Sequence, residues 1–338
     1  AAYTTVVFIF IGSFTIAANS DYYVAKLDSS GNVLWAKGRV ETSGQVETNS
    51  ISVDLNGNVF VTASYNGSDG KQRTYCAKFD SNGNYIAART AGATLSNNST
   101  ALAGTIDGQN NFIIVGNYTG EFVFDGVSNN NGTSGFIIKY DNSLNQLFAA
   151  NIASAYPNNS GIYPRAIAAD VNGNIFINGY ANGVNIDFDP NPTTTYTVTN
   201  NGVFTLKLDQ NFNFGWLNFI QSADAPGSTS GRGQGIVVGA NGNVYIAGRF
   251  SGTIDFDSSA GTTSTLTSSG TNDLFVLKMN SQGIFNWAKR IGGTGITEYF
   301  QDIAIDNNEN IYLTGNFGGT VDFDPGPGVF NMISQNYE

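Results

Sequence analysis

Short segments of alternating apolar and polar residues recur along the whole chain, each bounded by Asn, Gly, Asp or Ser. One apolar segment follows a polar turn five times, as GNVFVTAS (57–64), NNFIIVGN (110–117), GNIFINGY (173–180), GNVYIAGR (242–249) and ENIYLTGN (309–316). Val, Ile, Tyr, Phe and Thr at period two are typical of strands, and helical spacing is absent. The pattern predicts an all-β protein.

A lysine-centred apolar segment alternates with this first marker. Its lysines are separated by 52, 61, 68 and 71 residues, at Lys26, Lys78, Lys139, Lys207 and Lys278. Each unit holds four strand-like segments, termed a to d, exemplified by 301–306 (a), 310–317 (b), 274–279 (c) and 284–290 (d). Such a repeat favours a propeller blade, because one small sheet cannot bury both faces unless it stacks on its neighbours. We predict a β-propeller of four-stranded antiparallel blades, with about five complete repeats, partial blades at both ends, and roughly six or seven blades if the ring closes.

One repetitive array accounts for all 338 residues as a single domain or a propeller fragment. Its blade parts are expected at 1–40, 48–90, 100–152, 164–220, 234–291 and 300–338. The apolar segment 6–14 lacks a preceding basic stretch and matches strand b, so we interpret it as a blade strand rather than a signal peptide. Both ends are thus expected within a blade, in a longer chain or in a piece whose open blades are completed elsewhere.

Composition narrows the chemistry. The chain has no His, one Cys, 12% charged residues and a net charge of -11, which argues against nucleic acid as a partner. Cys76 occupies a strand position where other repeats carry Val, Ile or Thr, which favours a buried thiol over a nucleophile, since no His is available as its base. Metal sites of the Cys/His type are excluded by the same counts. We expect a secreted, non-enzymatic β protein with polar turns and no membrane span.

The turns repeat Asp, then Gly three residues later and Asn four residues later, for example from Asp28, Asp54, Asp80 and Asp170. Asp at the first position of a type I turn accepts backbone N–H groups, and Gly supplies the positive φ that a following bulge requires. A calcium loop is the functional alternative, but further acidic ligands and a terminal Glu are missing. We predict hairpin turns.

Two repeated positions are assigned to the scaffold. Strand d carries a bulky residue nine positions after the repeat lysine, at Trp35, Phe148, Trp216 and Trp287, with Ala87 in the second unit. We predict that these rings pack in the core beside small residues, the alternative being a platform for sugar stacking. The repeat lysine is expected to extend its amine to water, or to a carboxylate of a DFD segment or of a turn in a neighbouring repeat.

Three DFD segments place two carboxylates one residue apart, at Asp187 and Asp189, Asp255 and Asp257, and Asp322 and Asp324. Such a pair, with loop carbonyls, is able to bind Ca²⁺. The structural interpretation is an Asp pair that caps a turn and pairs with the repeat lysine. We favour turn capping and keep Ca²⁺ as the alternative.

In an a–b–c–d blade the a–b and c–d turns share one face of the disc, and the longer b–c and d–a loops lie on the other. Function is expected where the repeats differ, on this variable-loop face. Its weak ligand-binding candidates, each also compatible with a solvated loop residue, are Tyr163, Arg165, Arg232, Glu298 and Tyr299.

Together these motifs resemble the bacterial β-propeller-repeat family of the SBBP type, found in large secreted and cell-surface proteins. The resemblance rests on D-x-F-V-x-K-x-[DN], W-A-K, D-x-x-G-N-[VI]-Y-[VIL]-[TA]-G and T-[VI]-D-F-D-P, and it is strongest in the last three repeats. It implies an extracellular scaffold or adhesion module and supplies no catalytic motif.

Two classes of function follow. The first is a non-catalytic extracellular or cell-surface scaffold for adhesion or self-assembly, whose partners are other copies of itself, surface proteins or glycans, and whose open blades form a fibre by strand complementation. The alternative is a secreted propeller that binds or cleaves glycans on the variable-loop face, with Tyr299 and Glu298 as the nearest aromatic platform and carboxylate.

Overall fold

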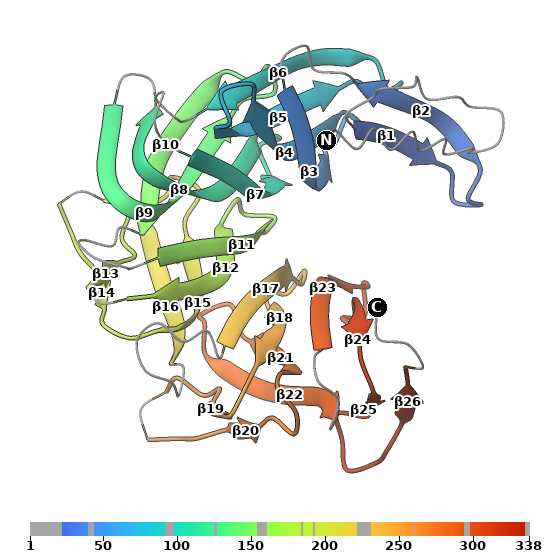
Figure 1. Cartoon of the computed structure of the whole chain (residues 1–338), viewed down its shortest axis with the longest axis vertical. Helices are drawn as coiled ribbons and strands as arrows, with labels where there is room; N and C mark the ends of the chain where they lie inside the picture. The colour runs from blue at the N-terminus through green and yellow to red at the C-terminus, as the bar shows by residue number, and fades with distance from the viewer. Residues whose placement is uncertain are drawn as a thin grey trace.

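The computed structural model (Figure 1) describes residues 22–39, 44–91, 98–124, 127–153, 161–183, 185–191, 193–221, 231–259, 261–293 and 298–334. The regular elements of these ranges are β-strands, arranged as an open arc of antiparallel sheets. The predicted all-β class is confirmed. The segment 6–14, predicted as a strand, lies outside the described residues.

Four consecutive units form complete four-stranded blades, numbered two to five, in the predicted order a, b, c, d. Blade two consists of β3 (Gly44–Val53), β4 (Val59–Gly67), β5 (Gln72–Phe79) and β6 (Tyr85–Ala91). Blade three consists of β7 (Asn98–Ile106), β8 (Phe112–Phe124), β9 (Val127–Tyr140) and β10 (Gln146–Ala153). Blade four consists of β11 (Gly161–Ala169), β12 (Ile175–Asn182), β15 (Gly202–Leu208) and β16 (Phe214–Gln221). Blade five consists of β17 (Gly231–Val238), β18 (Val244–Phe250), β21 (Asp273–Met279) and β22 (Phe285–Gly293).

The first and last units are each represented by two of the four blade strands in the described ranges. β1 (Tyr22–Leu27) pairs with β2 (Val33–Arg39) as strands c and d, and β23 (Glu298–Ile305) pairs with β24 (Ile311–Phe317) as strands a and b. We term these pairs the first and the last half-blade. They lie at the two ends of the arc (Figure 1), and within the described ranges no strand pairing joins them into a closed ring.

Short hairpins follow strand b in the last three units, and in blades four and five they lie between strands b and c. They are β13 (Ile186–Asp187) with β14 (Thr197–Val198), β19 (Thr253–Asp255) with β20 (Thr265–Thr267), and β25 (Thr320–Asp322) with β26 (Asn331–Ile333). Each insertion contacts the outer strand of the preceding unit, and β25 pairs with β22 directly. The insertions therefore connect consecutive blades at their outer edges.

The Asp/Gly/Asn turns close the hairpins as predicted. Asp80 Oδ1 accepts the backbone N–H groups of Asn82 at 2.9 Å and Asn84 at 2.8 Å, and its Oδ2 accepts the Asn84 side-chain amide at 2.8 Å. That side-chain bond is the largest cause that holds the pKa of Asp80 below its usual value. Gly83 has a φ of 80°, and the pairing register of β5 and β6 shifts between Lys78 and Phe79. The Asn four residues after the Asp thus donates hydrogen bonds from its backbone N–H and its side-chain amide to the two oxygens of the Asp carboxylate.

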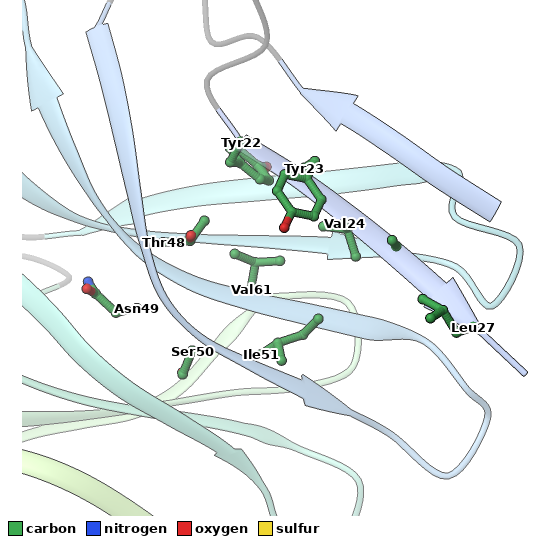
Figure 2. Close-up of a pocket in the computed structure, with 10 residues that line it drawn as sticks. Tyr22, Tyr23, Val24, Leu27, Thr48, Asn49, Ser50, Ile51 and Val61 are labelled. Carbon is green, nitrogen blue, oxygen red and sulfur yellow. The ribbon is translucent and has the colours of Figure 1, made fainter. Parts of the chain in front are cut away.

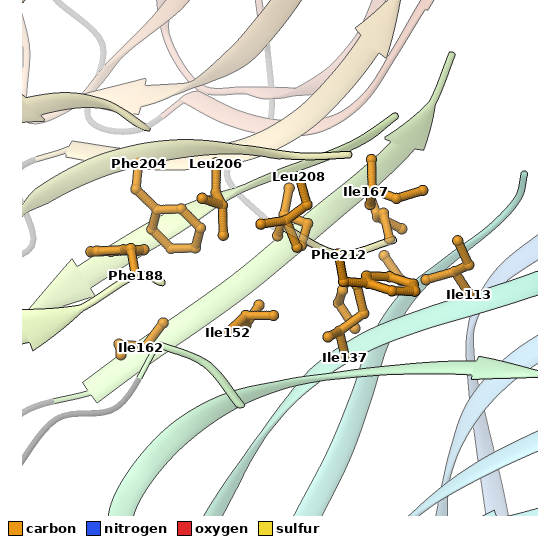
Figure 3. Packing of buried hydrophobic residues seen from close by; sticks show 14 of the residues in the cluster. Ile113, Ile137, Ile152, Ile162, Ile167, Phe188, Phe204, Leu206, Leu208 and Phe212 are labelled. Carbon is orange, nitrogen blue, oxygen red and sulfur yellow. The ribbon is translucent and has the colours of Figure 1, made fainter. Parts of the chain in front are cut away.

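The hydrophobic core lies between neighbouring blades. Figure 3 shows Ile113 and Ile137 of blade three facing Phe204, Leu206 and Leu208 of blade four. All five side chains are fully buried. Strands b and c read as nearly continuous apolar runs because both of their faces are covered by adjacent blades.

The outer-strand rings pack onto the turn of the next unit. The Trp35 indole N–H donates to the carbonyl oxygen of Ser81 at 3.1 Å, and a Cβ on Gly83 would lie 2.7 Å from the Trp35 ring. The corresponding distances between blades four and five are 3.2 Å and 2.7 Å, for Trp216, Ser281 and Gly283. Core packing of the rings is confirmed, and the small partner is the turn glycine of the following blade.

In two c–d turns the fourth residue is not Gly, and the residue of the preceding outer strand that contacts it is then not Trp. Phe148 stacks on Phe212 with ring centroids 4.3 Å apart and an angle of 2° between the planes. Ala87 lies in the same hydrophobic cluster as the buried Leu144. Phe212 and Leu144 have φ values of 63° and 61°, a conformation that costs a non-glycine residue about 1–2 kcal/mol. Contact with the preceding blade offsets this strain.

The repeat lysines reach turn residues, but in the described ranges only Lys278 does so through a carboxylate of a neighbouring repeat, as predicted. Lys278 Nζ lies 3.2 Å from Glu309 Oε2 in the next unit, and Lys139 Nζ lies 2.8 Å from Asp107 Oδ2 in its own blade. The two other described amine bonds run to the next blade, from Lys78 to Asn142 and from Lys207 to the Ser281 carbonyl. The described lysine contacts do not include a DFD aspartate, so that half of the prediction was wrong.

We predict that Gly283→Ala destabilises the fold by about 2–4 kcal/mol, because the new Cβ overlaps the Trp216 ring and also meets a positive φ. Gly70→Ala is the matched control, since Gly70 has a φ of 73° but open space around it. It should cost only about 1–2 kcal/mol of backbone strain. Urea unfolding of both variants checks this, and equal losses would contradict the contact between turn and ring.

Candidate functional site

Three of the residues predicted from the sequence lie close together. Tyr163 and Arg165 are on β11, strand a of blade four, and Arg232 is on β17, strand a of blade five. They stand near the strand ends that the d–a loops lead into, opposite the Asp/Gly/Asn turns. These three candidates therefore gather where blades four and five meet on the variable-loop face.

The cluster centres on Tyr180 of β12. The Tyr163 ring stacks on the Tyr180 ring with centroids 4.6 Å apart and planes 14° from parallel. The guanidinium carbons of Arg232 and Arg165 lie 4.9 Å and 5.6 Å from the Tyr180 centroid. Two cations thus share one buried aromatic ring, an arrangement that desolvation strengthens.

A third cation adds to the positive charge. Arg249 on β18 is directly opposite Arg232 in the strand register, a placement that is unfavourable for like charges. The pKa of Arg232 lies below its usual value, first because of burial and then because the positive charges of Arg249 and Arg165 oppose its own, while Tyr180 acts in the other direction. A local positive centre therefore stands out in a chain with a net charge of -11.

Sequence reasoning missed Tyr180 and Arg249. Both occupy the same place in the strand b motif, the residue after glycine in GNIFINGY and GNVYIAGR. The sequence signal for both residues is that this strand b position differs between repeats.

The remaining two candidates are placed only by their backbone. Glu298 and Tyr299 belong to β23 and pair with Phe317 and Asn316 of β24. Their side chains lie outside the described part of the structure. The glycan platform predicted from them stays a prediction.

The DFD segments form hairpin ends. Asp255 Oδ1 accepts the N–H groups of Asp257 at 3.0 Å and Ser264 at 2.8 Å, which ties both sides of the β19–β20 hairpin. Asp257 in turn accepts the N–H of Ser259 at 2.9 Å, while Phe256 between them is buried. The same N–H bonds recur at Asp187 and Asp189, and at Asp322 and Asp324. Turn capping, the favoured interpretation, matches this geometry.

Among the residues that the structure covers, no group of three or more Asp, Glu, Cys or His side chains is arranged to hold a metal ion. The assignment of Ca²⁺ to the DFD pairs remains a prediction.

An uncharged groove of about 680 Å³ runs along the first half-blade. Figure 2 shows Tyr23, Val24 and Leu27 along β1 facing Ile51 and other residues of the neighbouring strands. Tyr23, Leu27 and Ile51 are each half exposed or more. Within the described ranges β1 pairs with β2 alone, so the groove follows an open strand edge.

Cys76 is buried, as predicted, and burial raises the pKa of its thiol to about 12. A thiol with such a pKa is almost wholly protonated at neutral pH and is a poor nucleophile. None of the described segments is a helix of the length and hydropathy needed to cross a membrane.

With this geometry established, the all-β class with four-stranded propeller-type blades is clear, and comparison with known proteins agrees with it. Residues 286–316 match the model of the SBBP family, Beta-propeller repeat. The chain is 26% identical over 196 residues, 55% of its length, to the uncharacterized WD repeat-containing protein L264 of Acanthamoeba polyphaga mimivirus. It spans 14% of that relative.

A solved structure of a protein of unknown function from Dyadobacter fermentans is also similar. It has a TM-score of 0.46 and 8% sequence identity, with 86% of this chain and 83% of that chain covered.

We predict that adding millimolar Ca²⁺, or removing Ca²⁺ with EGTA, shifts the midpoint of thermal unfolding by less than about 1 °C. The reason is that backbone N–H groups already donate to the first aspartate of each pair. Differential scanning calorimetry measures this. A rise of several degrees with Ca²⁺ that Asp255→Asn abolishes would instead establish the calcium site.

Proposed function

We propose that the protein is a non-catalytic scaffold of the cell surface or the extracellular space that assembles with other copies through its half-blades. The observation that carries the proposal is the exposure, in the half-blades, of side chains whose counterparts in complete blades are buried. Tyr312 of β24 is 58% exposed, whereas Tyr245 at the same position of β18 is 1% exposed. The outer edge of β24 is thus an apolar strand edge that pairs, in the described residues, with no strand c.

The first half-blade likewise exposes side chains whose counterparts in complete blades are buried. Tyr23 and Leu27 of β1 are 51% and 50% exposed, while Phe275 and Met279 at the same positions of β21 are fully buried. β1 is a strand c, and among the described strands it has no strand b beside it. An edge of this kind is a template for β-augmentation, either by the segment 6–14, which the sequence predicts as strand b of this unit, or by another chain.

If β24 of one copy pairs with β1 of another, an aromatic residue of β1 lies opposite a glycine of β24, as in a complete blade. In blade five Phe275 is opposite Gly248, where a Cβ would lie 2.9 Å from the Phe275 ring. Applied to β24 and β1, the same register places Tyr23 opposite Gly315. The absence of a side chain at Gly315 leaves room for the tyrosine ring.

The two edges also match at the repeat lysine. In blade five Lys278 is opposite Tyr245, with its amine 4.8 Å from the ring centroid. The same register places Lys26 of β1 opposite Tyr312 of β24. The exposed tyrosine and the exposed lysine would then form the cation–π contact found within complete blades.

The outer strand supplies a third match. Trp287 has, in the part of the chain described, no acceptor for its indole N–H, unlike Trp35 and Trp216. Gly31, in the turn of the first half-blade, has nothing within 4 Å of an added Cβ, whereas Gly283 is covered by a tryptophan. The β1–β2 hairpin of a second copy therefore offers Trp287 the turn glycine that it lacks.

Surface location is supported by composition and by the repeat type. The chain combines few charged residues with abundant Gly and a single, buried Cys. The SBBP match at residues 286–316 supports the propeller repeat, and the surface location stays part of this proposal.

We predict that the chain self-associates and that Tyr312→Glu weakens association at least about tenfold, since it places a charge on the apolar edge of β24. Size-exclusion chromatography with light scattering over a concentration series measures the mass. Val329→Glu is the matched control, because Val329 is 71% exposed in the nearby insertion. A mass of one chain at every concentration, or equal association of both variants, would refute the assembly.

A further inference from the structure

We infer that the β25–β26 hairpin, termed the last insertion, is a second contact surface between copies and that it covers the β1–β2 hairpin of a neighbouring copy. The last insertion follows β24 at one end of the arc (Figure 1). The inference rests on the proposed assembly and deepens it, because it names a surface outside the β24 edge and the part of the partner that this surface fits.

The first argument is an incomplete cluster of aromatic rings. In blade five Phe256 of the insertion lies 5.3 Å from Phe250 of strand b and 4.9 Å from Phe275 of strand c, measured between ring centroids. In the last unit Phe323 and Phe317 repeat the first of these pairs at 5.2 Å, and the described ranges contain no strand c of this unit. Phe323 is accordingly half-buried, whereas Phe256 is fully buried.

The first strand of the partner hairpin carries a ring at the position required. Tyr23 of β1 stands three residues before its repeat lysine, the place that Phe275 and Phe204 hold in complete blades. In blade four Phe204 again lies 5.0 Å from the insertion ring, which is Phe188. When β1 of a second copy takes the place of strand c, the half-exposed Tyr23 therefore completes the cluster of three rings.

The second strand of the insertion has its own counterpart in blade four. Asp187 accepts the backbone N–H of Tyr196 at 2.8 Å, and Asp322 accepts that of Phe330 at 2.7 Å, so Tyr196 and Phe330 hold the same position. The Tyr196 ring stacks on Phe214 of strand d in its own blade, with centroids 4.7 Å apart. Phe330 is thus placed to lie on an outer strand.

The outer strand β2 of the partner hairpin fits this place. Phe214 stands seven residues after its repeat lysine, and the residue at that position of β2 is Val33. Phe330 is 64% exposed, and Met332 two residues later is 45% exposed. The residues aligned with Met332 in the other insertions, Val198 and Leu266, pack against the cores of their blades. A second copy would bury both exposed apolar side chains.

The last insertion is held in position without a partner. Its first strand pairs with β22 at Gly292 and Gly293. Asp322 ties the two sides of the hairpin through backbone N–H groups, and Pro325 and Pro327 fix φ at two positions of the loop between them. An apolar surface that is fixed in this way loses little conformational entropy when a second copy covers it.

The two faces of β26 provide a matched control. Alternation along the strand places Phe330 and Met332 on one face and Val329 on the other. Val329 is aligned with Thr195 and Thr263, which are exposed in complete blades. Its face is therefore expected to stay in solvent in the assembly.

Cysteine cross-linking tests the contact. Phe330→Cys and Val33→Cys are made as separate variants, mixed and treated with a short bismaleimide, so that only a contact between copies joins them. We expect a linked dimer whose joined peptides tandem mass spectrometry identifies, and at least about fivefold less product when Val329→Cys replaces Phe330→Cys. Cys76 does not interfere, because it is buried and the pKa of its thiol is raised to about 12.

Light scattering separates this contact from the β24 edge. Phe330→Glu should weaken self-association at least about tenfold, as expected for an aromatic residue at the centre of an interface. If Tyr312→Glu weakens association but Phe330→Glu does not, the assembly stands and the contact of the last insertion is wrong. If the unaltered chain does not associate, both proposals fail. A single chain carrying both cysteine substitutions that links internally at the mass of one chain would overturn the assignment to a second copy.

Discussion

Contacts between the fourth residue of a turn and the preceding blade recur along this array and hold neighbouring blades together. Trp35 and Trp216 rest on turn glycines, Phe148 stacks on Phe212, and Glu309 receives the amine of Lys278. Each blade has two apolar faces and buries them only against its neighbours. The order of the blades therefore follows from a chain of contacts in which every unit depends on the next, and the half-blades are the units in which this chain of contacts is incomplete.

These contacts involve the turns on one face of the array, so the loops on the other face are free to vary in sequence and length. Several turns on one face contact the neighbouring blade, whereas the b–c and d–a connections on the other face differ from unit to unit. The DFD hairpins use this freedom to reach the preceding outer strand. The arginine and tyrosine cluster uses it at the seam of blades four and five, where inner strands from two units meet.

The sequence predicted the blades because a four-strand period and the turn chemistry are local properties. It did not predict which groups meet between units. Trp35 was expected beside the small residue that follows it, and it lies on Gly83 of the next blade. Likewise, Tyr180 was passed over because its importance comes from Arg232, which is on another blade. Such contacts depend on how the sheets are rotated against each other, a quantity that residue spacing does not contain.

A double-mutant cycle at Ala87 and Leu144 tests the dependence between blades most directly. Ala87→Trp overfills the space that Leu144 occupies, and Leu144→Gly empties it while relieving a φ of 61°. The account predicts that the pair together recreates the tryptophan and glycine contact of Trp35 and Gly83, so that the double variant is more stable than the sum of the two single effects by about 1–3 kcal/mol. Additive losses in urea unfolding would contradict it.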